Sequence, residues 1–268
     1  MDTKLVLITG AASGIGLHLA KSLSEKGYAL VVIDLNLEQL QMEFRENEKL
    51  LIFSGDVSLP STWEKILHLI DSKNAIVSHL FNCAGVIRPG FVKDFELYDI
   101  DFHFNVNTKG SILGLKFIAD RMKVQGFGHV ITIASLAGLA PVSGLSLYAA
   151  SKFAIRGFCL AAAAEYKQFG VKISVVCPDL VATPMLDLQL EYPEETKLTF
   201  SGPSKVLQPE DITKALIRLM DKPKELICIP ESRGLLAKIA GIWPWAGEVF
   251  REKLEKKGAE TIKKLRSR

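Results

Sequence analysis

Seven short apolar runs alternate along the chain with longer segments whose apolar residues recur at helical spacing. The runs cover residues 4–9, 29–34, 50–54, 78–82, 129–134, 171–177 and 226–229. Alternating strands and helices predict a parallel sheet. Several runs, such as residues 5–8 and 173–177, are almost continuously apolar, which is typical of strands that helices cover on both faces. The sequence therefore predicts an α/β fold with a doubly wound, seven-stranded parallel sheet of the Rossmann type.

The αβ alternation ends near residue 230. A chain of 268 residues is close to the limit for one hydrophobic core, so we expect a single main domain over residues 1–230. An amphipathic, basic extension is expected over residues 231–268. Between 183 and 208 a polar stretch with prolines lacks clear periodicity, and connections of this length are commonly lids over a pocket.

The formal charge of +3 is unevenly distributed. Residues 249–268 contain eight Lys or Arg and three Glu, whereas the remaining 248 residues sum to −2. A nucleic-acid binder would instead line a docking face or groove with basic residues. We therefore expect no nucleic-acid partner.

Cysteine and histidine residues are scattered. The four cysteines include no close pair and the five histidines form no cluster, so we expect neither a metal site nor a disulfide framework. Apolar neighbours suit buried thiols in a reducing compartment, which predicts a cytoplasmic protein. The first apolar run begins at residue 4 and leaves no room for a signal peptide. No stretch approaches the roughly 20 uninterrupted apolar residues of a membrane-spanning helix.

The segment TGAASGIG, residues 9–16, joins the first predicted strand to the first helix. Such a loop can present backbone amides and a helix dipole to a pyrophosphate, and glycine permits the close approach. By itself the motif is equally compatible with a tight strand-to-helix turn. Its candidate cofactor-binding residues are Gly10, Ser13, Gly14, Ile15 and Gly16.

Asp34 ends the second predicted strand, about 20 residues beyond the glycine loop. A carboxylate there can accept hydrogen bonds from an adenosine ribose and would repel the 2′-phosphate of NADP. The next residues, Leu35 and Asn36, supply no positive charge. The position favours NAD over NADP, although Asp34 could also cap the helix that begins near Asn36.

Two further strand ends carry small or polar residues where ligands of open α/β sheets bind. They are Asp56-Val57 and the NCAG segment of residues 82–85. Each alone is compatible with an ordinary turn at the end of a strand. Because these ends share an edge of the sheet with the glycine loop, the candidate cofactor-binding residues also include Asp56, Val57, Asn82, Ala84 and Gly85.

Tyr148 and Lys152 lie four residues apart in a segment of helical character. On a helix this spacing places both side chains on one face, so the ammonium can lie near the phenol and lower its pKa. A phenol with an ordinary pKa near 10 would then serve as a general acid or base. An isolated pair of this kind is more often an amphipathic surface pair, so its weight comes from the combination of motifs.

That combination resembles the short-chain dehydrogenase/reductase family over residues 3 to about 230. The matching features, in order, are TGAASGIG, Asp34, Asp56-Val57, NCAG, Asn107, Ser135, Tyr148 and Lys152. The resemblance implies an oxidoreductase that moves a hydride between NAD and an alcohol or ketone.

The same resemblance assigns roles to individual residues. It implies that Tyr148 donates or accepts the proton, that Lys152 lowers the pKa of Tyr148 and holds the nicotinamide ribose, and that Ser135 binds the reacting oxygen. Asn107, in the VNTKG stretch of residues 106–110, would support a water-mediated proton relay, while Asn105 does not match.

Residues 178–185, PDLVATPM, resemble the family's PGxVxT segment. The resemblance implies that Pro178, Val181 and Thr183 lie at the nicotinamide carboxamide. Asp179 replaces the usual glycine, so it either alters the backbone of this loop or places a carboxylate near the substrate.

The expected pocket wall is apolar, which favours a lipophilic alcohol or ketone as the substrate. The same side chains could instead pack against the lid or one another. They are Leu136, Leu139, Pro141, Val142, Leu145, Met185, Leu186 and Leu188.

The terminal segment 235–268 has apolar residues at helical spacing, a break at Pro244, and many lysines. It could make peripheral contact with an anionic membrane, close the substrate pocket, or pack on a partner subunit. The family resemblance implies a homodimer or homotetramer with contacts around residues 98–123 and 148–168.

Two other functions compete with an oxidoreductase. A non-catalytic NAD(H)-sensing or scaffold protein could keep the fold and lose the chemistry, but it would not need Asn107, Ser135, Tyr148 and Lys152 together. A sugar-nucleotide epimerase or dehydratase is disfavoured by the short substrate region.

Overall fold

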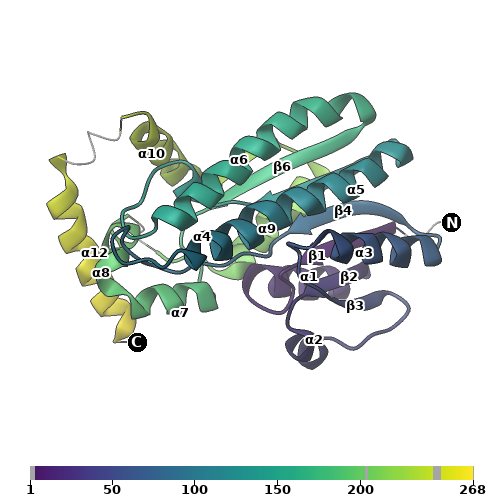
Figure 1. The fold of residues 1–268 in the computed structure, drawn as a ribbon, viewed down its shortest axis with the longest axis horizontal. Helices are drawn as coiled ribbons and strands as arrows, with labels where there is room; N and C mark the ends of the chain where they lie inside the picture. Colours follow the sequence, from purple (N-terminus) through teal and green to yellow (C-terminus); the bar gives the residue numbers. More distant parts are fainter. Residues whose placement is uncertain (1–3, 203–204, 244–248, 268) are drawn as a thin grey trace.

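A parallel sheet of seven strands forms the centre of the molecule in a computed structural model that describes residues 4–202, 205–243 and 249–267. Its strand order is β3-β2-β1-β4-β5-β6-β7 (Figure 1). The order reverses at β1 and β4, which confirms the predicted doubly wound sheet. The strands are β1 (Lys4–Thr9), β2 (Ala29–Asp34), β3 (Leu50–Ser54), β4 (Ile76–Asn82), β5 (Gly128–Ile133), β6 (Val171–Pro178) and β7 (Leu226–Ile229).

Helices cover both faces of this sheet. One face packs against α3 (Pro60–Ser72), α5 (Ser111–Gln125) and α6 (Ser146–Tyr166), and the other against α1 (Gly14–Glu25) and α9 (Pro209–Asp221). The remaining described helices are α2 (Leu37–Glu43), α4 (Tyr98–His103), α7 (Pro184–Glu191), α8 (Pro193–Phe200), α10 (Glu231–Ile242) and α12 (Arg251–Arg266). A π-helix, Phe104–Gly110, joins α4 to α5, and two short 3-10 turns cover Leu136–Gly138 and Lys167–Phe169.

Strand β1 explains why the apolar runs are continuous rather than alternating. Leu5 and Leu7 belong to the core on the α3, α5 and α6 face, whereas Val6 and Ile8 belong to the core on the α1 and α9 face. Successive strand residues point to opposite faces, and both faces exclude water here. Burial of each such side chain contributes roughly 1.5–3 kcal/mol.

The stretch 183–208 contains two short helices, whereas the sequence predicted a connection without regular structure. Pro184 and Pro193 occupy the first turns of α7 and α8. Backbone N–H groups at these positions have no partner within the helix, so proline, which has no N–H, is tolerated there. Each helix has only eight residues, so neither is long enough to display a clear apolar period. Phe200, at the end of α8, is fully buried.

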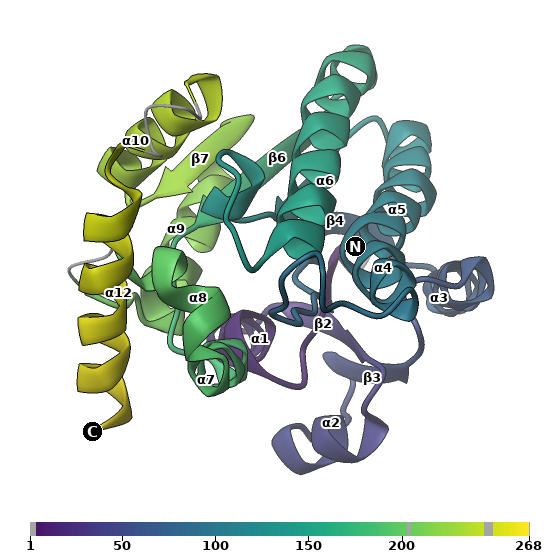
Figure 2. The same cartoon turned by 60° about the vertical axis from the view of Figure 1, so that its left-hand side comes forward.

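The basic extension is packed against these two helices. Figures 1 and 2 show α12 running beside α7 and α8 at one end of the molecule. Ile262 of α12 is 3% exposed and lies in a cluster with Leu186 and Phe200. A Cβ on Gly258 would lie 1.8 Å from the Lys197 carbonyl oxygen, so glycine permits the close helix contact. The predicted break at Pro244 lies outside the described residues.

The segment Ser146–Phe169 is long and apolar enough to cross a membrane by length and composition, which the sequence analysis did not anticipate. Its position in the fold gives another reason for this composition. Ile155 and Cys159 of α6 are buried in the core that also contains Val175 of β6. The apolar face of α6 therefore serves the protein interior.

Candidate active site

One cavity of about 1410 Å³ lies at the carboxyl ends of the strands. This is the edge at which open α/β sheets bind ligands. The structure brings most of the predicted site residues together there. Those lining the cavity are Gly10, Ser13, Gly14, Ile15, Gly16, Asp34, Asp56, Val57, Ala84, Gly85, Ser135, Tyr148, Lys152, Pro178, Val181 and Thr183.

The glycine loop is packed directly on the end of β4. Gly10 has a φ of +66°, and a Cβ on it would lie 2.7 Å from the backbone nitrogen of Ala84. Thr9 completes the junction, because its Oγ1 accepts hydrogen bonds from the Cys83 and Ala84 nitrogens, both at 3.1 Å. The loop is therefore held close to the strand end.

The loop leads into the N-terminus of α1, which faces the cavity. Ser13 is the N-cap residue and its side chain makes no capping hydrogen bond. Backbone N–H groups at a helix N-terminus lack partners within the helix and attract anions. These features fit the pyrophosphate of a dinucleotide.

Asp34 is held at the cavity by two backbone donors. Its Oδ2 accepts from the Ala12 nitrogen and its Oδ1 from the Asn36 nitrogen, each at 3.0 Å. The helix cap is Asn36, whose Oδ1 accepts from the Gln39 nitrogen at 3.0 Å. Of the described cavity residues between positions 10 and 57, none is Lys or Arg.

Asn82 points away from the cavity. Its Nδ2 donates to the Ser111 carbonyl oxygen at 3.2 Å and to Thr132 Oγ1 at 3.3 Å. The side chain is buried between β4, β5 and the start of α5. The structure therefore shows Asn82 as a brace behind the predicted site.

Asn107 also lies behind the cavity wall. It occupies the π-helix and is fully buried, with Oδ1 accepting from the Val86 nitrogen at 2.8 Å. Its Nδ2 donates to the Val86 carbonyl oxygen at 2.9 Å and to Ser151 Oγ at 3.0 Å. The side chain thus fixes the loop after β4 against α6. A Cβ on Gly85 would lie 3.3 Å from Asn107 Oδ1 and 3.5 Å from Lys152 Nζ.

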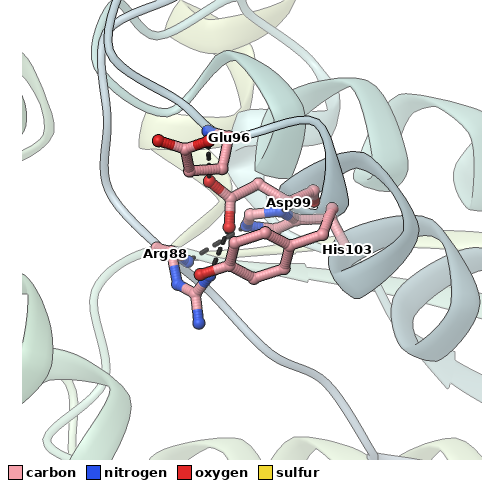
Figure 3. A network of polar contacts seen from close by, with 5 residues as sticks. Arg88, Glu96, Asp99 and His103 are labelled. Atoms are coloured by element: carbon pink, nitrogen blue, oxygen red, sulfur yellow. Dashed lines mark hydrogen bonds and ion pairs between the residues drawn. The ribbon is translucent and has the colours of Figure 1, made fainter.

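A second polar network anchors the same loop farther along (Figure 3). His103 is fully buried, its Nε2 accepts from the Arg88 nitrogen at 3.0 Å, and its Nδ1 lies 2.7 Å from the Asp99 carbonyl oxygen. Because Nε2 accepts a hydrogen bond, the ring proton lies on Nδ1. Asp99 forms an ion pair with Arg88 and accepts from the Glu96 nitrogen. Sequence reasoning missed these residues, because no local motif signals them.

Tyr148 is 8% exposed and Lys152 is 3% exposed. Lys152 Nζ donates to the Ile133 carbonyl oxygen at 3.0 Å and lies 5.7 Å from the centroid of the Tyr148 ring. Ser135 Oγ accepts from the Ala137 nitrogen at 3.1 Å. The three side chains therefore share one wall of the cavity.

Burial changes the pKa values of both Tyr148 and Lys152. Burial raises the pKa of Tyr148 to about 12, and a hydrogen bond with Ser135 acts in the opposite direction. Burial also lowers the pKa of Lys152 to about 8. Burial penalises the phenolate and so opposes the lowering of the Tyr148 pKa that is expected from Lys152.

Asp179, the departure from the family pattern, forms an ion pair within the cavity wall. Arg233 Nε of α10 donates to Asp179 Oδ2 at 2.9 Å, and Asp179 Oδ1 accepts from the Leu180 nitrogen at 3.0 Å. Both charged residues line the cavity. The carboxylate therefore links the end of β6 to the C-terminal extension.

The other half of the cavity is largely apolar. Its predicted wall residues line it, except for Leu139, which packs in the core. The extension contributes to the same wall, which is one of the three arrangements considered from the sequence. Its cavity-lining residues are Arg233, Leu236, Ala237 and Ala240 of α10 with Arg251 and Leu254 of α12.

Comparison with known proteins agrees with this geometry. A family model described as short chain dehydrogenase matches residues 4–192. The chain is 28% identical over 227 residues to the cyclopentanol dehydrogenase of Comamonas sp. (strain NCIMB 9872), covering 82% of this chain and 90% of that protein.

Solved structures share the fold. ElxO with NADP bound superposes with a TM-score of 0.75 and 24% identity, covering 85% of this chain and 97% of ElxO. The complex of 4-hydroxyisoleucine dehydrogenase with NADH has a TM-score of 0.73 and 21% identity, covering 81% and 90%.

Proposed function

Because the chain belongs to the short-chain dehydrogenase family of oxidoreductases and shares its fold with a solved structure that binds NADP, we propose that it interconverts a lipophilic secondary alcohol and its ketone with NAD. One observation carries the proposal: Ser135, Tyr148 and Lys152 line the same cavity as the glycine loop and Asp34. The similarity to a dehydrogenase named for cyclopentanol supports a secondary alcohol as the substrate.

The nucleotide half of the cavity offers a binding group for each part of the cofactor. The N-terminus of α1 would hold the pyrophosphate, Asp34 the adenosine ribose, and Lys152 the nicotinamide ribose. Val181 and Thr183 would border the carboxamide, and Thr183 Cγ2 lies 3.2 Å from where a Cβ on Gly14 would be. When bound, the cofactor supplies or accepts the hydride.

The carboxylate of Asp34 supports NAD over NADP. A 2′-phosphate near it would meet like charge, and the described cavity residues in this half provide no cation to offset the repulsion. Relatives of this fold bind either cofactor, so the preference depends on this local charge.

Tyr148 and Ser135 would handle the proton. The Ser135 Oγ accepts from the Ala137 nitrogen, and its hydroxyl would donate its proton to the substrate oxygen in place of its hydrogen bond with Tyr148. Tyr148, protonated because burial raises its pKa to about 12, would donate its proton to a ketone oxygen during reduction. Alcohol oxidation needs the phenolate, so we expect oxidation to require alkaline pH while reduction proceeds near neutrality.

Two measurements test this function. Fluorescence energy transfer from tryptophan to the reduced nicotinamide compares the binding of NADH and NADPH, and the nicotinamide absorbance band then follows reduction of a panel of lipophilic ketones. We expect NADH-selective binding with turnover, and an Asp34→Ala variant with a smaller preference for NADH. NADH binding without turnover of any ketone would support a sensor instead, and a preference for NADPH would contradict the role of Asp34.

A further inference from the structure

The C-terminal extension exposes an unusual concentration of large apolar side chains. They include a tryptophan and a phenylalanine, and they are 43–75% exposed. Exposed apolar patches on soluble proteins mark interaction sites. The seven residues are Leu235, Leu236, Ile239, Ile242, Trp243, Val249 and Phe250.

Four of these side chains lie on one side of α10, and Trp243 follows at the C-cap of the helix. At roughly 100° per residue, Leu235, Ile239 and Ile242 fall within an arc of about 60°, and Leu236 widens it to about 120°. An apolar arc of this width on a surface helix normally faces the core. On α10 it faces outward, and Lys238 borders it.

The outward face is continuous with the substrate cavity. Leu236 is 56% exposed and also lines the cavity, together with Ala237 and Ala240 on the adjoining side of the same helix. An apolar path therefore leads from the surface of α10 to the apolar half of the cavity. Arg233 of the same helix also lines the cavity, where it is paired with Asp179.

Charge indicates what covers this face. Residues 249–268 carry eight basic and three acidic side chains, whereas the rest of the chain sums to −2. Five lysines of α12 are exposed: Lys253, Lys256, Lys257, Lys263 and Lys264. A second copy docked face to face would bring two positive extensions together, while an anionic surface would attract each basic residue by about 1 kcal/mol.

We propose that the apolar face of α10 and the start of α12 docks on an anionic lipid bilayer, and that lipophilic substrate enters the cavity from that bilayer. The tryptophan at the end of α10 suits the headgroup level of a membrane, and the helix would lie in the plane of the interface. The docking is argued from the exposed apolar residues and the charge of α12 alone, whereas the entry of substrate from the bilayer rests on the proposed function.

Vesicle flotation of the full-length protein tests the docking. The probes are phosphatidylcholine vesicles with and without phosphatidylglycerol, and the variant is Ile242→Glu combined with Trp243→Glu. Neither residue lines the cavity. We expect binding to vesicles that contain phosphatidylglycerol, weaker binding at high salt, and a partition coefficient at least about tenfold lower for the double variant.

The matched control is Met42→Glu. Met42 is 71% exposed on α2, which lies far from α10 in both views of the fold (Figures 1 and 2), so the vesicle binding of this variant should equal that of the unaltered protein. Equal melting temperatures would establish that all three proteins are folded. No vesicle binding by the unaltered protein, or equal loss in both variants, contradicts the proposal.

Light scattering tests the competing possibility that a second copy of the chain covers this face. If the double variant has a lower oligomeric state than the unaltered protein, and the unaltered protein does not bind vesicles, the face is an interface between copies and the proposal is wrong. Turnover of a water-soluble ketone without vesicles reports on the proposed function independently, because it requires no membrane.

Discussion

Gly10 shows how one residue couples the two central strands of the site. Its left-handed backbone and its 2.7 Å approach to the Ala84 nitrogen both exclude a Cβ. The first requirement concerns conformation, and the second concerns the distance between the glycine loop and β4. Only the second bears on the shape of the cofactor site.

Gly10→Ala should therefore destabilise the fold by more than the roughly 1 kcal/mol that a left-handed alanine costs, and should weaken NADH binding. Gly27→Ala is the matched control, because Gly27 has a φ of +81° with nothing within 4 Å of a Cβ. Urea denaturation and NADH titration of both variants give the comparison. Equal loss of NADH affinity in the two would contradict the role of the Gly10 contact.

Residues that belong to local motifs could be predicted from sequence, and residues paired across the fold could not. The glycine loop, Asp34, Ser135, Tyr148 and Lys152 all reach the cavity as expected. The Asp179–Arg233 pair joins positions 54 apart, which no local pattern reveals. The pKa of Tyr148 also depends on burial, which the spacing to Lys152 does not reveal.

At the scale of elements, α12 is the least predictable and the most consequential part. Its sequence is dominated by charge, and only Gly258 and Ile262 are buried. Those two positions pack α12 onto α7 and α8. Because α7 and α8 have only eight residues each, the sequence did not reveal either helix. The extension thereby becomes part of the wall of the apolar half of the cavity.

Ile262→Asp should release α12, because an unpaired carboxylate replaces a buried side chain at a cost of about 3 kcal/mol or more. We expect a higher KM for a lipophilic ketone and unchanged NADH affinity, since the nucleotide half lies elsewhere. Lys263→Asp, at an exposed neighbouring position, should alter neither. Limited proteolysis would report the release, and an unchanged KM despite release would show that α12 does not shape the pocket.

Three buried or partly buried histidines in and beside the sheet predict that the stability of the whole molecule depends on pH. His79 on β4 and His129 on β5 have ring centroids 5.8 Å apart. Burial lowers the pKa of His79 to about 4 and that of His129 to about 3, and it also lowers the pKa of His103. The folded state therefore resists binding protons that the unfolded chain accepts at its ordinary pKa near 6.5.

The contribution of these histidines to the free energy of unfolding should be fully present above about pH 6.5 and decrease as the pH drops toward 4, because the unfolded state then binds more protons than the folded state. His79 alone would contribute up to about 3 kcal/mol to this loss. Urea midpoints measured across the range should decline less steeply for His79→Gln, whereas exposed His68→Gln should match the unaltered protein. A flat profile for the unaltered protein would contradict neutral burial of these rings.

The alternation of strands and helices made the sheet of the whole molecule predictable, because every strand is apolar and bounded by turns. The packing of the extension and the polar networks behind the loop after β4 depend on contacts that form only once that sheet exists. Some residues of the site therefore belong to local sequence motifs, and others, which hold those motifs in place, come together only in the folded chain.

Tyr148→Phe is the sharpest test of the proposed proton transfer, because phenylalanine keeps the buried ring and removes the one hydroxyl assigned to that step. NADH affinity and turnover of a reducible ketone would be measured side by side on the two proteins. We expect NADH binding within about twofold of the unaltered protein and turnover lower by about 10²–10⁴-fold. Turnover at the unaltered rate would contradict the assignment of Tyr148 as the general acid and base.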